Sequence, residues 1–308
     1  KRCPISVLNY ETGLLNNTTN YIITDALGFT WLSTKIGLQR FNGNQLETII
    51  PVAGKDTFNI NEPVYLFNLK NGMMWISFRN NILEFNPFLK TFRIVITTGA
   101  SGNSGFSIVP LKETSEGVWC MQEKKGIVIY SPKGKITRQI AFYNTDIIDK
   151  IIHSEQLLLK TIITSNRNYI FIYGGNNQIL KINTQTNKFD FINCESSFNL
   201  SLSCTENHLF IVTTGKFLMM NINDSVVTKT VLLNKITNAV INNNSIILDH
   251  SGQLLVSMNN HLYELDTLGN FKAEITDLNR NPVVNTGYIS RVYTDKFKRI
   301  WLLCNDDV

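Results

Sequence analysis

The four histidines of the chain are the first residues to consider for acid–base or metal chemistry. They are His153, His208, His250 and His261, and no two of them have the spacing of a metal-binding pair. His250 falls in a predicted hairpin turn, and His261 falls at a hairpin end. We interpret them as loop histidines and expect no metal ligand among them.

Motifs for nucleophilic, zinc-dependent or nucleotide chemistry do not occur in the sequence. It contains no HExxH, no GxSxG and no complete P-loop. The run from Gly99 to Gly105 is rich in glycine but lacks the Lys-Ser/Thr pair of a phosphate-binding loop, so we interpret it as a flexible loop between repeats. We therefore predict no catalytic residue and no cofactor, and expect that the chain is not an enzyme. A site assembled from carboxylates distant in sequence stays open as an alternative.

Separated cations and one aromatic residue are better candidates for ligand binding. They follow the second strand of successive predicted repeats, where hairpins would share one face. Ammonium and guanidinium groups form charge-assisted hydrogen bonds with anions or sugar hydroxyls, and an aromatic ring stacks on a sugar-like ligand. The alternative is that these residues are ordinary solvated hairpin tips. The candidate ligand-binding residues are Lys35, Arg79, Lys124, Lys125, Tyr173 and Lys216.

The spacing of the tryptophans predicts the elements that position these candidates. Trp31, Trp75 and Trp119 are each 44 residues apart, and Trp301 follows 182 residues later, which is four units of about 45. A fixed period of 40 to 50 residues is typical of propeller blades. Three degenerate copies fill the long gap, at Tyr169–Ile172, Leu209–Val212 and Leu254–Ser257.

Each repeat has the same order of turns and strands. An acidic residue such as Asp25, Asp249 or Asp295 stands six positions before the tryptophan position, and a glycine often stands three before it. This pattern predicts a tight hairpin turn between an inner strand and the tryptophan strand. An apolar strand, a turn beginning with Asn, Asp or Ser, and a more polar outer strand follow. We predict an all-β fold, a seven-bladed β-propeller of four-stranded antiparallel blades over residues 1–308 as a single domain, with the tryptophans buried between blades.

The last copy is shorter than the others. It has an inner strand at Tyr288–Thr294 and a tryptophan strand at Arg299–Cys304, but no outer strands before Val308. We expect an incomplete last blade in a fragment of a larger protein. We also expect the run Ile5–Tyr10 to dock on this blade and close the ring.

Composition narrows the functional classes. The net charge is +5 and the pI about 8.8, but the basic residues are scattered, so we expect no nucleic-acid partner. No apolar run reaches the roughly 18 residues of a membrane helix, and no signal peptide precedes Pro4. Five cysteines are an odd number, and Cys120 and Cys304 lie in apolar strand patterns. We expect mostly free, buried thiols.

The stretch from Gly13 to Gly43 resembles the two-component regulator propeller repeat. The matching segments are Gly13–Asn17, Asp25–Thr34 and Gly37–Phe41, with Ser33 where that family usually has glycine. The first, second, third, sixth and seventh copies match motif by motif, whereas the fourth and fifth keep only the hydrophobic pattern.

The resemblance implies a periplasmic sensor region of a Bacteroidetes hybrid two-component system, anchored in the inner membrane. It implies oligosaccharides or other small extracellular ligands, signalling to a histidine kinase, and contacts with a second propeller and C-terminal domains of the same chain. Homodimerisation is left open. The motif is structural, so it transfers no binding residues. The alternatives are a scaffold for protein partners, marked by an exposed apolar patch, and a propeller lyase or hydrolase, marked by converging residues with perturbed pKa values.

Overall fold

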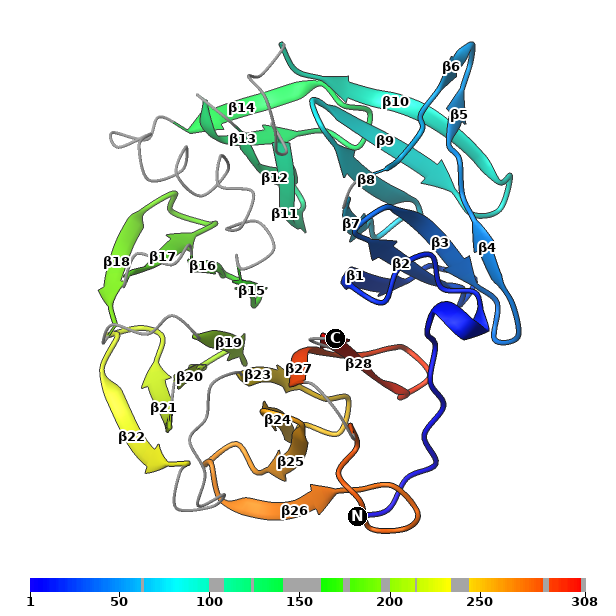
Figure 1. The fold of residues 1–308 in the computed structure, drawn as a ribbon. Coiled ribbons are helices and arrows are strands. Elements are labelled where there is room, and N and C mark those ends of the chain that lie inside the picture. The colour runs from blue at the N-terminus through cyan, green and yellow to red at the C-terminus, as the bar shows by residue number, and fades with distance from the viewer. Residues whose placement is uncertain are drawn as a thin grey trace. The chain divides into compact units, whose positions relative to one another are not determined.

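The computed structural model describes residues 1–61, 64–99, 108–122, 125–140, 162–173, 178–194, 200–213, 215–233, 244–284 and 288–305. The predicted all-β propeller fold with four-stranded antiparallel blades is confirmed: β-strands dominate these residues (Figure 1). The one helix within these ranges is the 3-10 turn η1 (Tyr10–Thr12). Nothing helical in the described part of the chain has the length and apolarity to cross a membrane.

The first three blades follow the predicted strand order. Each is an antiparallel sheet in which strands consecutive in sequence are neighbours. A short ribbon of β5 (Val52–Ala53) and β6 (Asp56–Thr57) lies between the first two blades in sequence. The blade strands are β1 (Thr19–Thr24), β2 (Thr30–Thr34), β3 (Gly37–Phe41) and β4 (Leu46–Thr48); β7 (Tyr65–Asn68), β8 (Met74–Phe78), β9 (Asn81–Asn86) and β10 (Thr91–Thr97); and β11 (Ile108–Thr114), β12 (Gly117–Gln122), β13 (Gly126–Tyr130) and β14 (Ile136–Ile140).

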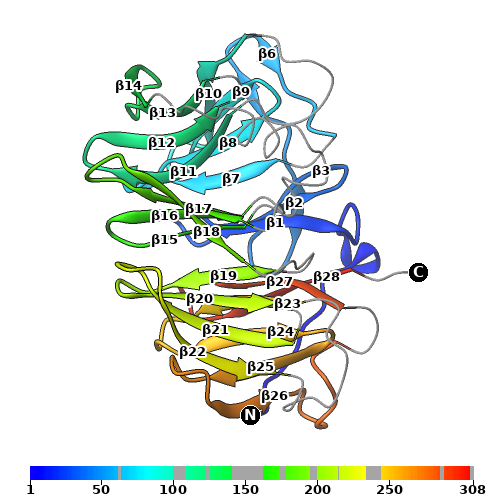
Figure 2. The ribbon, with the colours of Figure 1, turned by 90° about the vertical axis from the view of Figure 1, so that its left-hand side faces the viewer.

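The next three blades repeat the same order, although two of them carry only the hydrophobic pattern of the repeat. Figure 2 shows the strands of the sixth blade running side by side. The strands are β15 (Ile162–Ser165), β16 (Tyr169–Tyr173), β17 (Gln178–Asn183) and β18 (Phe189–Asn193); β19 (Ser201–Cys204), β20 (His208–Thr213), β21 (Lys216–Asn221) and β22 (Val227–Leu232); and β23 (Asn244–Leu248), β24 (Leu254–Met258), β25 (His261–Leu265) and β26 (Phe271–Ile275).

The predicted count of seven blades is wrong: the described residues form six four-stranded blades. The seventh copy forms a two-stranded sheet of β27 (Tyr288–Thr294) and β28 (Ile300–Asn305) in the described residues. The repeat period located this copy correctly, but a tryptophan strand and an inner strand alone do not make a four-stranded blade.

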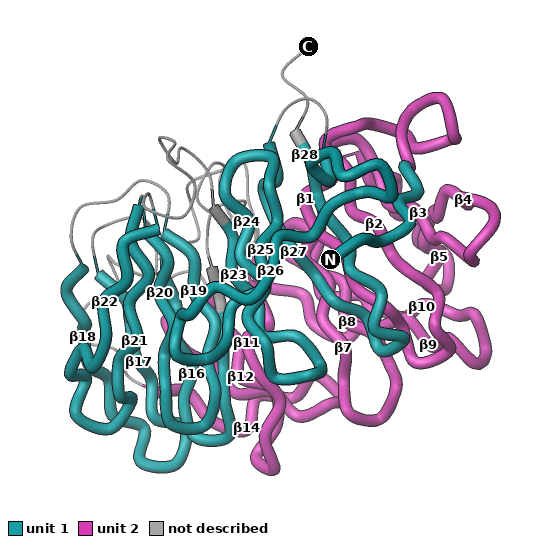
Figure 3. Tube along the Cα trace, turned by 90° about the horizontal axis from the view of Figure 1, so that it is seen from below, with its two compact units in different colours: residues 1–7, 162–308 teal, residues 8–161 magenta. Residues whose placement is uncertain are grey.

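The chain divides into two compact units (Figure 3). One unit comprises Lys1–Val7 and Ile162–Val308, and the other comprises Leu8–Thr161. The first unit therefore holds blades four to six with β27 and β28, and the second holds blades one to three.

Trp31 and Trp75 lie in the core between adjacent blades, as predicted, whereas Trp301 is only half-buried. Trp31 is fully buried and packs in a cluster with Val64, Leu66 and Ile76 of the second blade. Trp75 is also fully buried and packs with residues of the third blade such as Val118. Burying a large aromatic side chain at one position of each repeat makes neighbouring sheets adhere through the hydrophobic effect.

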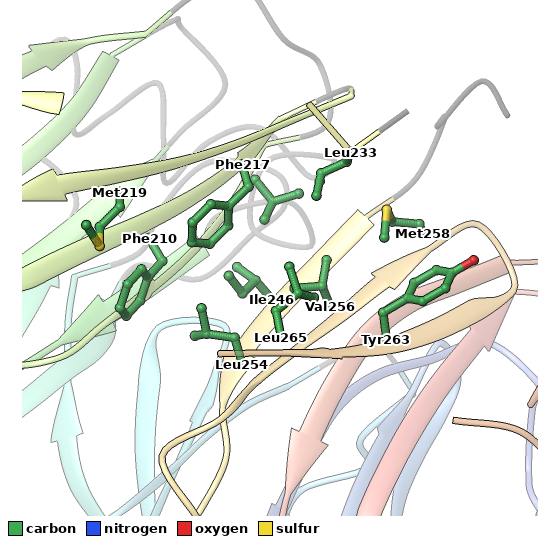
Figure 4. Close-up of a cluster of buried hydrophobic side chains, with 11 residues drawn as sticks. Phe210, Phe217, Met219, Leu233, Ile246, Leu254, Val256, Met258, Tyr263 and Leu265 are labelled. Carbon is green, nitrogen blue, oxygen red and sulfur yellow. The ribbon is translucent and has the colours of Figure 1, made fainter. Parts of the chain in front are cut away.

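Smaller apolar residues replace tryptophan in the degenerate copies. Figure 4 shows the cluster between the fifth and sixth blades, where Phe210 and Phe217 lie beside Ile246, Leu254 and Val256. All five side chains are at most 5% exposed. These copies thus keep the inter-blade core without the tryptophan.

Serine hydroxyls join each of several blades to the inner strand of the next. Ser33 Oγ accepts a hydrogen bond from the backbone N–H of Val64 at 2.8 Å, and Ser77 Oγ donates to the carbonyl oxygen of Ile108. Ser33 and Ser77 are fully buried. A buried hydroxyl needs a partner, and here the partner belongs to the neighbouring blade. Further links of this kind are Ser201 with Ile246, Ser203 with Leu248 and Ser245 with Val292.

The N-terminal residues attach to the sixth blade. Cys3 N–H donates to the carbonyl oxygen of Thr276 at 3.0 Å, directly after β26, and Lys1 pairs with Glu264 at 2.7 Å. The expectation that Ile5–Tyr10 forms the closing strand is wrong. This run contains no strand, and Val7 is 66% exposed. Attachment comes from polar backbone pairing of residues 1–3 instead.

Candidate ligand-binding face

The acidic turn of the first blade is filled by its own hydrogen bonds. One oxygen of the Asp25 carboxylate accepts from the backbone N–H groups of Leu27, Gly28 and Phe29 at 2.8 to 3.0 Å. Its other oxygen accepts from the indole Nε1–H of Trp31 at 2.9 Å. Asp25 is 2% exposed. The carboxylate therefore joins the turn to the inter-blade tryptophan and is not available to a ligand.

The seventh copy reproduces this arrangement. Asp295 accepts from the backbone N–H of Phe297 and Arg299 at 2.9 and 3.0 Å, and from the indole of Trp301 at 2.9 Å. The guanidinium of Arg299 adds a further bond. Burial acts to raise the pKa of Asp295, but the bonds from Trp301 and Arg299 outweigh it, so that the pKa is lowered.

The same turn recurs at Asp249, which belongs to the predicted motif, and at Asp266 and Asp277, which do not. In each, the carboxylate accepts N–H groups two and four residues later, and desolvation is outweighed by these bonds, so the pKa is lowered. The acidic turn is thus a structural unit of the fold. The backbone N–H to O bonds that close it join Asp249 to Gln253, Asp266 to Asn270 and Asp277 to Asn281, at 2.8 to 3.0 Å.

The opposite ends of blades one to three carry three of the predicted candidates. Lys35, Arg79 and Lys125 lie in the turns β2–β3, β8–β9 and β12–β13, and all three are exposed. These turns are equivalent positions of three successive blades in one unit. The guanidinium of Arg79 lies 5.1 Å from the ring centre of Phe78, where a cation–π interaction holds it. Lys124 lies outside the described residues.

The other two candidates, Lys216 and Tyr173, belong to the unit that holds blades four to six, and they differ from each other. Lys216 begins β21 and is half-buried. Tyr173 ends β16, is 3% exposed and packs in a cluster with Ile179. Burial, followed by the influence of Cys194, raises its pKa. The expectation that this ring is accessible for stacking is therefore wrong, because the end of β16 points it into the core.

Two of the four histidines have a hydrogen-bond partner for the imidazole ring. His250 Nε2 lies 2.7 Å from the carbonyl oxygen of Asp295, and His261 Nδ1 lies 2.7 Å from the Glu274 carboxylate. Within the described ranges, no three His, Cys, Asp or Glu side chains are grouped so as to hold a metal ion. His153 and residues 100–105 of the glycine-rich run lie outside those ranges.

Three other buried groups have raised pKa values. Burial is the main cause that raises the pKa of Tyr130 and of Tyr263 to about 12 in each case. Tyr130 donates its hydroxyl to Gln122. Burial likewise raises the pKa of the Cys120 thiol. Each of these groups sits in the packed core, and burial is the largest cause of each shift.

An exposed apolar patch at the acidic-turn end was missed by sequence reasoning. Leu27 is 46% exposed, Phe88 59% and Leu89 71%. Leu27 lies in the turn β1–β2, and Phe88 and Leu89 lie in the turn β9–β10. In a four-stranded antiparallel blade the turn after the first strand and the turn after the third strand lie at the same end. A Cβ on Gly72 would lie 3.3 Å from both Ala26 and Phe88, so both turns approach this glycine. The run Pro87-Phe88-Leu89 in a turn was the available signal.

Solved structures similar to this chain include sensor ectodomains. The extracellular domain of the hybrid two-component system BT3049 from B. thetaiotaomicron is 17% identical with a TM-score of 0.66, over 98% of this chain and 40% of that one. The extracellular domain of the one-component system BT4673 from the same organism is 19% identical with a TM-score of 0.62, over 94% and 37%. The WD40 domain of Neurospora crassa Pan2 is 9% identical with a TM-score of 0.66, over 96% and 90%.

These likenesses show the fold. This chain spans about two fifths of the length of the two bacterial ectodomains. The resemblance to two-component sensor ectodomains that the sequence suggested is thereby confirmed at the level of fold. No family model matches the sequence, and no curated protein matches it.

Proposed function

We propose that this chain is a ligand-sensing propeller in the periplasmic ectodomain of an inner-membrane two-component sensor. The observation that carries the proposal is the fold likeness to the extracellular domains of BT3049 and BT4673 over 94 to 98% of the chain. In this proposal the chain forms a single propeller domain within a longer ectodomain, with a second propeller and C-terminal domains as neighbours. A histidine kinase elsewhere in the parent protein receives the signal, and the chain itself is not an enzyme.

The proposed ligand is an acidic or heavily hydroxylated oligosaccharide. The exposed cations Lys35, Arg79 and Lys125 support this, because they repeat at equivalent turns of adjacent blades. Charge-assisted hydrogen bonds to carboxylate or sulfate groups suit such a row of cations. Lys124 and Lys216 complete the proposed set, while Tyr173 is buried in the core. Signalling requires that the ligand bind one ectodomain arrangement better than another.

A thermal-shift screen tests this proposal. The purified chain is mixed with a panel of polysaccharide fragments, paired as acidic oligosaccharides and neutral ones of the same length. A ligand at a hundredfold excess over its Kd stabilises the folded state by about 2.7 kcal/mol, which a melting curve resolves. We expect a shift with acidic members. Failure of every fragment to shift the melting temperature of either this chain or the full ectodomain would contradict the proposal.

A scaffold for protein partners is the second candidate, and the patch of Leu27, Phe88 and Leu89 favours it. Apolar side chains this exposed and adjacent mark contact surfaces. Sedimentation velocity of the wild type and of Leu89→Glu compares the two candidates. Concentration-dependent self-association that Leu89→Glu abolishes would support homodimerisation through this patch, and monomers at every concentration would count against it.

A further inference from the structure

Two tyrosines on neighbouring inner strands form an aromatic pair in the unit of blades one to three. Tyr21 of β1 and Tyr65 of β7 have ring centres 4.5 Å apart, and their planes are inclined by 45°. The two strands lie side by side (Figure 1). Both side chains are half-buried, so each keeps part of its surface in solvent. The ring of Tyr173, by contrast, is 3% exposed and cannot stack on a ligand.

The pair arises because the two tyrosines occupy the same position of the repeat. Tyr21 lies opposite Ser33 in the β1–β2 ladder, and Tyr65 lies opposite Ser77 in the β7–β8 ladder. Ser33 Oγ accepts the backbone N–H of Val64, the residue directly before Tyr65, and this bond holds the start of β7 against the first blade. The link between the blades therefore also sets the two rings beside each other.

The same position carries smaller, buried side chains in two other blades. In the third blade it is Val109, opposite Met121, which is 0% exposed. In the sixth blade it is Ser245, opposite Ser257, which is 6% exposed. Packing between blades therefore does not require an aromatic ring at this position. The partly exposed rings of blades one and two are a local addition, which favours recognition over core packing.

The pair lies at the end of the blades that carries the hairpin cations. Ser33 stands two residues before Lys35, and Ser77 stands two residues before Arg79. Lys35 N–H also donates to the carbonyl oxygen of Thr18 at 3.1 Å, which ties its hairpin to the segment that enters β1. Adjacent strands are about 4.8 Å apart, so each ring begins one strand away from a hairpin with an exposed cation.

We propose that Tyr21 and Tyr65 form a stacking platform for a pyranose ring, here called the tyrosine platform. The face of an aromatic ring is negative, so the polarised C–H groups on one face of a sugar pack against it. Lys35 or Arg79 then binds an acidic substituent of the same sugar through a charge-assisted hydrogen bond. Aromatic side chains with a few polar groups beside them are typical of ligand sites. This inference rests on the proposed oligosaccharide sensing and assigns its aromatic subsite.

Saturation-transfer NMR with two simple glycosides tests the tyrosine platform. The probes are methyl β-glucopyranoside, which is neutral, and methyl β-glucuronide, which carries a carboxylate. The aromatic protons of the protein are saturated, and transfer is read at the axial C–H protons on one face of the sugar. Titration gives the affinity of each probe. The variants are Tyr65→Leu, Tyr21→Leu and Arg79→Ala, with Tyr10→Leu as the matched control at a tyrosine that is 73% exposed.

Tyr65→Leu is the primary variant, because Tyr21 also packs against the core cluster around Trp31. Urea denaturation checks that each variant is folded. We expect both glycosides to receive saturation from the wild type, and Tyr65→Leu to bind both about three- to tenfold more weakly, the size of one aromatic contact. Arg79→Ala should weaken binding of the glucuronide alone, and Tyr10→Leu should weaken neither. No transfer to either glycoside in the wild type, or unchanged affinity in folded Tyr65→Leu, would overturn the proposal.

Failure of the tyrosine platform is distinct from failure of the sensing proposal. An oligosaccharide that raises the melting temperatures of the wild type and of Tyr65→Leu equally would contradict the platform alone. Glycoside binding that depends on Tyr65, with no polysaccharide fragment shifting the melting temperature of this chain or of the full ectodomain, would support the platform and contradict the sensing proposal.

Discussion

The two ends of the blades differ in how their polar groups are used. At the acidic-turn end, Asp25 and Asp295 each accept hydrogen bonds from backbone N–H groups of their own turn. Each also accepts one from the indole of the tryptophan that is the second residue of the following strand. At the opposite end, Lys35 and Lys125 extend from short hairpins and are exposed. The first end satisfies its charges internally, whereas the second leaves cations facing solvent.

This difference separates structural from recognition residues. The acidic turn satisfies the hydrogen bonds of its own carboxylate, so we assign it a structural role. The same turn at Asp266 and Asp277, which precede no tryptophan strand, supports that role. Hairpins that vary in length on a rigid repeat are where binding specificity usually lies. In sequence, the segment between the second and third strands is two residues long at Lys35-Ile36 and four residues long between Tyr173 and Gln178.

The largest effect should come from the inter-blade core that both ends share. Trp75→Ala removes a fully buried side chain and should lower the free energy of unfolding by about 3–5 kcal/mol, because the cavity cannot refill. Urea denaturation measures this loss. Trp301→Ala is the matched control and should cost less, because Trp301 is half-buried. A loss under about 1 kcal/mol for Trp75→Ala would contradict the burial of this residue.

Removing an acidic turn should have the next largest effect. Asp295→Ala leaves an indole N–H and two backbone N–H groups without their acceptor, and should cost about 2–3 kcal/mol. The lowered pKa of Asp295 also gives this effect a pH dependence. A carboxylate with a depressed folded pKa stabilises the protein above its unfolded pKa of about 3.9 and loses that contribution as the pH falls through the folded pKa.

The stability of the wild type and of Asp295→Asn should therefore converge on acidification below about pH 4. Denaturation at pH 7 and at a series of acidic values checks this, provided that the protein is still folded at the lowest pH. A difference between the two proteins that stays constant across the series would show that the charge of Asp295 does not contribute.

A smaller effect is expected at the serine links between blades. Ser33→Ala leaves the buried N–H of Val64 without its acceptor and should cost about 1–2 kcal/mol. Ser33→Thr keeps the hydroxyl and serves as the control for loss of hydrogen bonding alone. Equal stability of Ser33→Ala and the wild type would mean that the link adds nothing to blade packing.

The blades were predictable because their signal is local and periodic. The spacing of Trp31, Trp75 and Trp119 placed three tryptophan strands correctly, and the acidic turns fell where Asp25 and Asp295 indicated. The blade count went wrong at the seventh copy, where the period continues but the described residues form only β27 and β28.

Features that depend on distant parts of the chain were not predictable. The partner of Ser33 is Val64 in the next blade, so the sequence around Ser33 gives no sign of the bond. Tyr173 was expected on an accessible hairpin because it ends a strand, but which face of β16 it occupies depends on packing against the next blade. The residues proposed to bind ligand stay a prediction, since solvated tips and binding tips have the same local sequence.

The smallest effect on stability and the largest on function should come from the hairpin cations. Arg79→Ala combined with Lys125→Ala should change the free energy of unfolding by no more than about 0.5 kcal/mol, because both side chains are exposed. Chemical denaturation checks this, and a larger loss would give these residues a structural role.

The most direct test of the division between the two ends is a binding titration with an acidic oligosaccharide that raises the melting temperature of the wild type. Its affinity is measured by calorimetry for the wild type, for Arg79→Ala with Lys125→Ala, and for Asp249→Asn at the acidic-turn end. We predict that the double variant loses at least about tenfold in affinity, or about 1.4 kcal/mol, and that folded Asp249→Asn binds as the wild type does. Unchanged affinity in the double variant, with a loss in folded Asp249→Asn, would place recognition at the acidic-turn end and contradict the account.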